Sequence, residues 1–428
     1  MAQLDRPDVP VDAAAASIRL SGATVPTEIL EVAQRLQDRG HAAVLVGGAV
    51  RDVLLGLPAD DWDLATSARP EEVQAAFRRT IPTGIEHGTV TVLVRPAADA
   101  PREGHEAHVP VEVTTFRGEG AYIDGRRPSA ITFLRDLIED LARRDFTVNA
   151  FAWDPIARRF DDPFDGLADL RAGVLRAVGD PARRFGEDGL RTMRAVRLCA
   201  TRSLRLEPGT EAAIAGALEV LAKVSRERVH VELVKLLGAP QPSAGLVPMA
   251  QTGIWPLVLP PLPEPLRSDA IAAVDRLSRD AVLRLARLLW PVVASARSDI
   301  TAALDGLRHG RADRARLDAL LGPGAQALVD AAAPVEIRRA AAALGRAHVD
   351  DVGTIAALDE GARARVAAAL HGAALTVDEL ALRARDLIAR GLATPGPALG
   401  GLVRRLLDAV LEDPTLNEPE RLAALARR

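Results

Sequence analysis

The sequence predicts an α+β protein in which a small α/β domain precedes an all-helical remainder. Segments typical of strands alternate with helical ones over residues 26–150, whereas apolar residues recur mostly with helical spacing from Leu167 on. Ala, Arg and Leu dominate after about residue 180, which favours helices there. The apolar fraction of 48% allows a sizeable core, built mostly from Leu, Val, Ala and Ile, because the chain has only four Trp, one Tyr and eight Phe.

Local patterns place most elements of the first 115 residues. Residues 1–24 mix Ala, Asp, Pro and Ser and are expected to form a mobile leader. An apolar run that stops at Gly47-Gly48 predicts a strand ending in a tight turn. The predicted helices are Pro26–Arg39 and Ala49–Leu55, the predicted strands are Ala42–Val46, Trp62–Ala65, Thr89–Val94 and Val109–Thr115, and Pro96–His108 is a predicted loop.

Proline- and glycine-rich points divide the helical remainder. They fall at Pro208-Gly209, Pro240–Ser243, Pro260–Pro265, Gly322–Gly324 and Thr394–Leu399. The length of 428 residues suits roughly two to four domains. We expect the leader 1–24, an α/β domain over 25–155, and helical segments over 156–240, 241–322 and 323–428.

The composition excludes several classes of protein. The single cysteine, Cys199, excludes a disulfide framework and a multi-cysteine zinc site. No charged-then-apolar leader opens the chain and no run approaches the roughly 18 apolar residues of a membrane span, so we expect a cytoplasmic protein with no membrane partner. The net charge of −4 does not indicate nucleic-acid binding. The local excess of arginine over 183–205 suits a phosphate-rich partner, although charge alone favours an ordinary solvated helix face.

Two aspartates that flank a tryptophan form the first candidate site. Asp61 and Asp63 lie on a predicted strand, and side chains two apart on a strand share a face. Two carboxylates that point into one space suit Mg²⁺, which prefers oxygen ligands and leaves room for substrate phosphates. Glu112, within another predicted strand, is a candidate third ligand. An Asp-x-Asp pair alone is more often a pair of surface charges. Whether this pair is a metal site must therefore be judged from the neighbouring residues.

A pair of glycines lies just upstream of these aspartates. Gly47-Gly48 joins a predicted strand to a predicted helix, where glycine lets the backbone approach a phosphate closely. The helix N-terminus adds free N–H groups and the positive end of the helix dipole. A phosphate site beside a carboxylate pair indicates metal-assisted phosphoryl or nucleotidyl transfer.

Several sequence blocks follow one another around these features. The first comprises Gly47–Asp52, Leu55-Gly56 and Asp61–Thr66; then come Pro82–Val90, Glu112–Arg117, Asp140–Ala150 and Glu187–Arg191, and a weaker block, Ser225–Arg228. In identity and order they resemble the motifs of class II tRNA nucleotidyltransferases and bacterial poly(A) polymerases, a family of the polymerase-β-like superfamily. The resemblance covers about residues 42–240, and beyond it the similarity is only of a helical kind.

The resemblance implies a polymerase-β-like nucleotidyltransferase head with a small mixed sheet, followed by an all-helical neck (156–240), body (241–322) and tail (323–428). It implies that Asp61 and Asp63 bind two Mg²⁺ ions and, with Glu112, are catalytic. Arg144 would bind the nucleotide phosphates and Asp145 the ribose hydroxyls; without the neighbouring blocks, this segment would be interpreted as a surface ion-pair cluster. The residues assigned to nucleotide binding are Gly47, Gly48, Arg51, Arg143, Arg144, Asp145, Asn149, Asp188, Arg191 and Arg194.

Asp188 and Arg191 resemble the pair that selects the base in this family. Three residues apart on a predicted helix, they would lie on one face. A carboxylate accepts a hydrogen bond from the amino group of C or A, and a guanidinium donates to the ring nitrogen beside it, whereas U and G reverse both polarities. The pair would therefore admit CTP and ATP and reject UTP and GTP. The alternative is a surface salt bridge worth under about 1 kcal/mol.

The activity implied is addition of C and A to the 3′ end of tRNA, with CTP, ATP and the tRNA acceptor arm as partners and no DNA. Such an RNA duplex would be recognised by shape and phosphate contacts. Alternatives are an enzyme that adds only A or only CC, a poly(A) polymerase, and a non-catalytic tRNA-binding protein on the same fold. Gly118–Pro128 resembles the flexible loop of A-adding enzymes, which argues against CC-only addition. Asp165 stands where the family usually has a glycine, so the turn there could differ.

Overall fold

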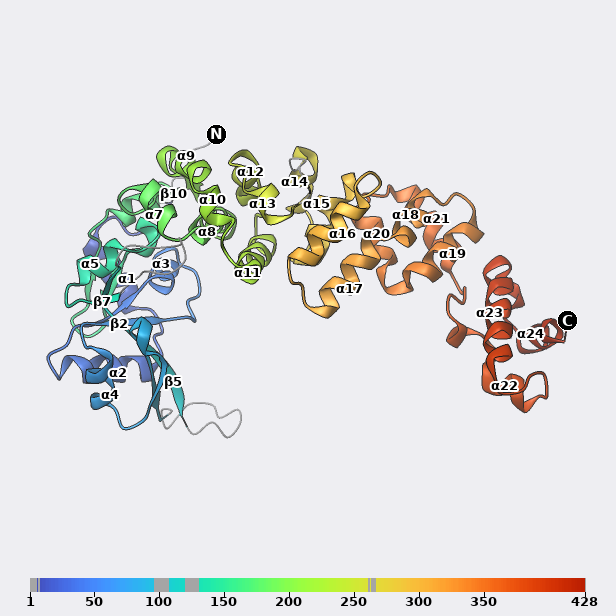
Figure 1. Cartoon of the computed structure of the whole chain (residues 1–428), viewed down its shortest axis with the longest axis horizontal. Coiled ribbons are helices and arrows are strands. Elements are labelled where there is room, and N and C mark those ends of the chain that lie inside the picture. The colour runs from blue at the N-terminus through green and yellow to red at the C-terminus, as the bar shows by residue number, and fades with distance from the viewer. Residues whose placement is uncertain are drawn as a thin grey trace. The chain divides into compact units, whose positions relative to one another are not determined.

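A seven-stranded mixed sheet forms the centre of the N-terminal region (Figure 1). The computed structural model describes Arg6 and residues 8–95, 108–119, 131–260, 262 and 267–427. The strand order is β3-β4-β5-β2-β1-β8-β9; β2 and β5 pair in parallel and the other neighbours are antiparallel. These strands are β1 (Ala43–Val46), β2 (Asp63–Thr66), β3 (Thr80–Gly84), β4 (Thr89–Val94), β5 (Val109–Thr115), β8 (Ala152–Asp154) and β9 (Arg159–Asp161), and a separate pair joins β6 (Arg117–Glu119) to β7 (Ile131–Phe133).

The predicted α+β class with a mixed sheet is confirmed. β4 and β5 have the predicted bounds, and β1, α2 (Thr27–Gln37) and α3 (Gly48–Leu54) begin and end within two residues of the prediction. The prediction missed three strands of this sheet, β3, β8 and β9. β8 and β9 have only three residues each, too few to show an alternating pattern. Most of the predicted loop over 96–108, and of the loop over 118–128, lies outside the described residues.

Helices and apolar side chains enclose the central strands. All four residues of β1 are buried, and α2 packs against β1, β2, β4 and β5. Val44 and Val46, which share a face of β1, form a core cluster with Leu141 of α5 (Leu137–Ala142). α4 (Pro70–Ala76) packs against β4 and β5. A strand covered on both faces is apolar throughout, which explains the uninterrupted apolar run in the sequence.

The N-terminal segment contains a helix, so the prediction of a mobile leader is wrong for that part. α1 (Ala13–Ser21) follows Asp12, whose carboxylate accepts a hydrogen bond from Ala15 N at 2.8 Å. Ala16 and Leu20 are completely buried, because α1 packs against α3 and β9. Two apolar residues four positions apart suffice to bury one face of a short helix, and the mixed composition concealed them.

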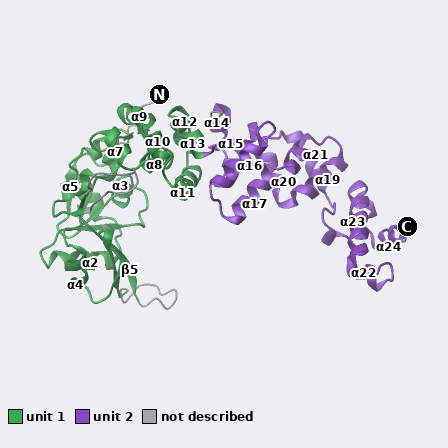
Figure 2. Ribbon diagram, in the orientation of Figure 1, with its two compact units in different colours: residues 1–258 green, residues 259–428 purple. Residues whose placement is uncertain are grey.

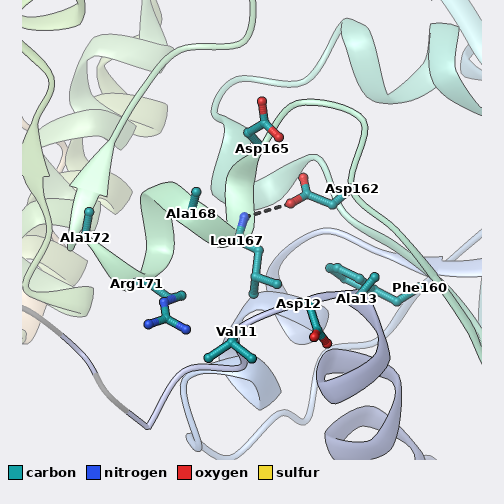
Figure 3. A pocket seen from close by; sticks show the side chains of 10 residues that line it. All are labelled: Val11, Asp12, Ala13, Phe160, Asp162, Asp165, Leu167, Ala168, Arg171 and Ala172. Carbon is teal, nitrogen blue, oxygen red and sulfur yellow. Dashed lines mark hydrogen bonds between the residues drawn. The ribbon is translucent and has the colours of Figure 1, made fainter.

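A tight turn before α6 (Gly166–Arg171) shows how the chain accommodates Asp165. This residue adopts a left-handed conformation (φ 55°, ψ 29°), which glycine enters most easily and short polar residues tolerate. The carboxylate of Asp162 accepts hydrogen bonds from Gly166 N and Leu167 N, both at 2.8 Å; Figure 3 shows the one from Leu167. The turn therefore keeps a glycine-like geometry. A cavity of about 550 Å³ beside it is lined by none of the residues assigned to catalysis or nucleotide binding (Figure 3).

Helices follow the sheet domain. The longest of those before residue 258, α8 (Leu190–Arg202), packs against α11 (Arg226–Leu237) and α12 (Ser243–Gln251). A two-residue parallel pair joins β10 (Val174–Leu175) to β11 (Arg205–Leu206). The remaining helices here are α7 (Pro181–Glu187), α9 (Pro208–Gly216), α10 (Leu218–Leu221) and α13 (Trp255–Val258).

The chain forms two compact units, Met1–Val258 and Leu259–Arg428 (Figure 2). The described part of the second unit is helical, as predicted; the finer division at 155, 240 and 322 stays a prediction. No helix among the described residues is long and apolar enough to cross a membrane. The helices of the second unit are α14 (Ser268–Val274), α15 (Ala281–Leu289), α16 (Arg297–Gly306), α17 (Arg311–Leu320), α18 (Pro323–Asp330), α19 (Pro334–Leu344), α20 (Val349–Ile355), α21 (Glu360–Leu370), α22 (Ala384–Ala389), α23 (Pro397–Glu412) and α24 (Pro419–Ala426).

Candidate active site

The turn between β1 and α3 forms one wall of the site. Gly47 has a φ of 78°, a left-handed conformation that side chains disfavour. A Cβ atom on Gly47 would lie 3.1 Å from Arg144 Nη1 and 3.2 Å from Asp63 Oδ2. The turn therefore lies directly against a guanidinium and a carboxylate that the sequence assigned to the reaction, and glycine is the residue that leaves this space open.

The two aspartates lie at the start of β2. The strand begins at Asp63, so Asp61 precedes it, contrary to the prediction that both lie on the strand. Exposure still alternates, because Asp61 and Asp63 are exposed and Trp62 between them is buried, so the two carboxylates face the same side. Partial loss of hydration raises the pKa of Asp63; the nearby Arg144 opposes this, and the charges of Asp61 and Glu112 add to it.

The aspartate pair has the properties of a divalent-metal site. Neither carboxylate accepts a hydrogen bond from a described residue, and their mutual repulsion favours a cation between them. Glu112 is exposed on β5, opposite Thr91 of β4. Its charge acts on Asp63, and its role as a third ligand stays a prediction.

A buried aspartate organises the arginines that follow α5. Asp140 is 1% exposed and accepts hydrogen bonds from Arg143 Nε at 3.0 Å and Arg143 Nη2 at 2.8 Å. Arg144 Nη2 lies 3.5 Å from the other oxygen of Asp140. Burial lowers the pKa of Arg144, and its Nε has no partner among the described residues. Asp140 thus holds one side of the Arg144 guanidinium, while Nη1 faces the turn at Gly47.

Asp145 lies within a buried hydrogen-bond network. Its Oδ1 accepts from Phe146 N at 2.9 Å and Asn149 Nδ2 at 2.8 Å, and its Oδ2 lies 2.7 Å from both Nε and Nη2 of Arg194. Burial alone would raise the pKa of Asp145, but the charge of Arg194 and these hydrogen bonds outweigh it and hold the pKa well below its usual range. Asp145 is therefore ionised, and Arg194 is its ion-pair partner.

Arg51 lies inside the protein. Its side chain is 6% exposed; Nε donates to Asp52 Oδ1 at 2.9 Å and Nη1 donates to Asn149 Oδ1. Burial lowers the pKa of Arg51, against the raising effect of the Asp52 charge. Through these contacts Arg51 holds Asp52 and Asn149 in place. A direct contact of Arg51 with the nucleotide stays a prediction.

The two residues predicted to read the base, Asp188 and Arg191, do not share a helix. Asp188 has an extended backbone (φ −146°, ψ 110°) at the end of α7, and α8 begins at Leu190, so the argument from one helix face is wrong. Asp188 precedes Gly189, the N-cap residue of α8, and caps that helix from outside, because its Oδ1 accepts from the first helical N–H, Leu190 N, at 3.0 Å. Its Oδ2 pairs with Arg228 Nη2 at 2.9 Å. The carboxylate is thus fixed by a helix cap and an ion pair.

Arg191 is anchored from both sides. Its Nη1 donates to Glu187 Oε2 at 2.6 Å and to the carbonyl of Arg184 at 2.9 Å. Its Nη2 donates to the carbonyl of Arg143 at 3.1 Å. This last bond joins α8 to the segment that contains Arg144 and Asp145. The structure therefore brings the predicted base-reading residues next to the predicted phosphate- and ribose-binding residues.

Sequence reasoning missed three contributors to this arrangement. Asp140, Glu187 and Arg228 hold Arg144, Arg191 and Asp188 respectively. All three lie inside the quoted motif blocks, so block membership was the available signal. The sequence could not show which side chains these three residues contact.

Comparisons with known proteins identify the family of this chain. Residues 43–176 match the family model "Poly A polymerase head domain", and residues 203–264 match "Probable RNA and SrmB- binding site of polymerase A". The CCA-adding enzyme of Pediococcus pentosaceus is 36% identical over 409 residues, which are 90% of this chain and 94% of that enzyme. This chain belongs to the CCA-adding enzyme family. It is accordingly a nucleotidyltransferase, as the sequence predicted.

Other members of the CCA-adding enzyme family match over different lengths. The enzyme of Levilactobacillus brevis is 46% identical over 224 residues, so that match spans about half of each protein (52% of this chain and 53% of that one). The crystal structure of the Bacillus stearothermophilus CCA-adding enzyme in complex with CTP has a TM-score of 0.72 at 31% identity and covers 94% of this chain and 96% of that one. A Thermotoga maritima CCA-adding enzyme complexed with tRNA shares the fold, with a TM-score of 0.68 at 18% identity.

Proposed function

We propose that this protein adds C and A nucleotides to the 3′ end of tRNA, using CTP and ATP and no nucleic-acid template. The observation that carries the proposal is the convergence of Asp63, Arg144 and the Gly47 turn within 3.2 Å of one point. Beside them, Arg191 is hydrogen-bonded to the carbonyl of Arg143. A carboxylate, a phosphate-binding cation and a base-reading group adjoin one another, as transfer from a nucleoside triphosphate requires.

Asp61 and Asp63 would hold the two Mg²⁺ ions that the family resemblance implies; both residues are exposed, and the repulsion between their carboxylates favours a divalent cation there. The chemistry that Mg²⁺ supplies in such a site is activation of the attacking 3′-hydroxyl and neutralisation of charge on the triphosphate. Arg144 would bind the phosphates through Nη1, which faces the Gly47 turn. Asp145, kept ionised by Arg194, would accept hydrogen bonds from the ribose hydroxyls by exchanging some of the four donor contacts that now fill its acceptor sites.

Base choice would rest on Asp188 and Arg191. A carboxylate has about four acceptor sites, so Asp188 can accept from the amino group of C or A while it caps α8 and pairs with Arg228. Arg191 would donate to the adjacent ring nitrogen. The wrong base would leave polar groups without partners in a water-poor site, which is how strong discrimination arises.

The first experiment uses purified protein with Mg²⁺, all four NTPs and tRNA transcripts that end before CCA, after one C, or after CC. The 3′ ends are then sequenced. Completion of all three transcripts to CCA is the expected result. Extension of only the CC-ended transcript by one A would identify an A-adding enzyme, and long A tails a poly(A) polymerase. No extension by folded protein would favour a non-catalytic tRNA-binding protein.

The Asp63→Ala variant tests the metal assignment. Removing a metal ligand is expected to lower the rate of addition about a thousandfold or more, because metal-bound charge stabilisation is worth several kcal/mol. Asp60→Ala is the matched control, since Asp60 is exposed three residues away and has no role in the site. Near-normal addition by Asp63→Ala would refute the assignment.

A further inference from the structure

A chain of hydrogen-bonded polar side chains begins and ends on α8; its inner members, Asp145, Asn149, Arg51 and Asp52, are buried. From Arg194 it passes through Asp145 to Asn149 (2.7 and 2.8 Å), and from Asn149 to Arg51. Arg51 Nε then donates to Asp52 at 2.9 Å, and Asp52 is bound by Arg202, eight residues after Arg194 on α8. These hydrogen bonds form a closed ring across the boundary between the sheet domain and the helices that follow it.

The Arg202–Asp52 pair closes this ring. Arg202 Nε lies 2.7 Å from Asp52 Oδ1 and Nη2 lies 2.6 Å from Oδ2, so the contact is bidentate. The Asp52 side chain is 11% exposed and that of Arg202 is 24% exposed. Arg6 fixes the same end of α8, because its Nη2 donates to the carbonyls of Arg202 (2.5 Å) and Ser203 (2.8 Å). A bidentate pair fixes orientation as well as distance.

The ring joins the proposed phosphate-binding part of the site to the proposed base-reading part. Asp52 belongs to α3, the helix that starts at the Gly47 turn, on the phosphate side. The start of α8 is capped by Asp188 and contains Arg191, on the base side. Arg194 and Arg202 are about 12 Å apart along α8, so two separated contacts hold this helix to the sheet domain and prevent it from pivoting about either one.

We propose that the Arg202–Asp52 pair is a positioning element that sets base selectivity from a distance. It holds α8, and with it Asp188 and Arg191, at a fixed distance from the turn that receives the phosphates. Hydrogen bonds to a base edge need donor–acceptor distances of about 2.7–3.2 Å, so a small rotation of α8 would disturb base reading while the triphosphate stays anchored. This inference rests on the proposed function, and it assigns Arg202 and Asp52 no contact with the substrate.

The experiment compares CTP with UTP in competition on a tRNA transcript that ends before CCA. Asp52→Asn removes the charge between two arginines at nearly constant size, and Arg202→Lys keeps the charge but loses the bidentate geometry. We expect the ratio of kcat/KM for CTP to that for UTP to fall about tenfold or more in Asp52→Asn, and less in Arg202→Lys. This ratio does not depend on the fraction of folded enzyme, so a loss of stability alone leaves it unchanged.

Glu232→Gln is the matched control. Glu232 pairs with Arg197, also on α8, and that pair is at least as buried (7% and 14% exposed) but joins α8 to α11. Its CTP-to-UTP ratio should remain that of the wild type, even if thermal stability falls. An unchanged ratio in both Asp52→Asn and Arg202→Lys, or an equal fall in Glu232→Gln, would overturn the inference. If Asp52→Asn does not fold, the CTP-to-UTP ratio of Arg202→Lys alone tests the inference. Absence of nucleotide addition by the wild type would instead refute the proposed function, and this inference with it.

Discussion

Replacing Asp188 by Asn gives the sharpest test of base reading. Asn keeps an oxygen that can accept from Leu190 N, the 3.0 Å bond that caps α8. It replaces the second oxygen, now paired with Arg228, by an NH₂ donor. Against cytosine, an acceptor–donor contact becomes a donor–donor contact; against uracil, the new donor meets a carbonyl. The preference for CTP over UTP should therefore fall.

The size of this effect follows from the contacts that change. A good contact to a base edge is worth about 1–3 kcal/mol, so the CTP-to-UTP ratio should fall roughly 5- to 150-fold. The cost in stability should be under about 1 kcal/mol, because the helix cap survives and the Arg228 pair is partly exposed (37% and 20%). Asp188→Ala would in addition lose the cap, about 1 kcal/mol more, and is the poorer variant.

The assay is competition between CTP and UTP on a transcript that ends before CCA, followed by sequencing of the 3′ ends. Asp180→Asn is a matched control, because Asp180 caps α7 through Ala182 N at 3.0 Å and takes no part in the site. An Asp188→Asn ratio equal to that of the control would refute the base-reading assignment, and so would an equal decrease in the addition of C and of U, which leaves the ratio unchanged.

Two further predictions concern the helices beside the site. Gly189→Ala should lower the free energy of unfolding by about 1–3 kcal/mol in urea denaturation, since its Cβ would lie 2.4 Å from Leu221 N. The control Gly186→Ala should be neutral or slightly stabilising, because a Cβ there would have nothing within 4 Å. Equal losses of stability in both variants would contradict the reasoning. Cys199 is 1% exposed and burial raises its pKa to about 12, so iodoacetamide at pH 8 should label it only in denaturant. Rapid labelling of the native protein would show that α8 opens.

The features that could be predicted from sequence are those that one segment determines by itself. The apolar run of β1, the bounds of β4 and β5 and the glycine turn are local, because burial and backbone conformation leave a direct pattern in the residues. The shared side of Asp61 and Asp63 also follows from alternation, although the strand begins at Asp63, one residue after the predicted start at Trp62. Motif blocks then identified the family without any knowledge of contacts.

The errors arose where contacts with other segments override the local pattern. α1 forms because α3 and β9 cover its short apolar face. The mixed composition of this segment did not predict that packing. Asp188 lies outside α8 because it ends α7 and caps the next helix, whereas the spacing to Arg191 was equally compatible with one continuous helix. The burial of Arg51 was also not visible in the sequence, because it depends on Asp52 and Asn149, which accept hydrogen bonds from its guanidinium.

The sequence by itself determined which residue types are present for the chemistry: a carboxylate pair, a glycine turn, and arginines in the right order along the chain. Only the tertiary structure decided which of them meet. Arg194 pairs with Asp145 across 49 positions and Arg202 pairs with Asp52 across 150, and no periodicity records a contact of that kind. Such pairs form because packing of α8 beside the sheet domain buries their charges, and a buried charge needs a partner of opposite sign.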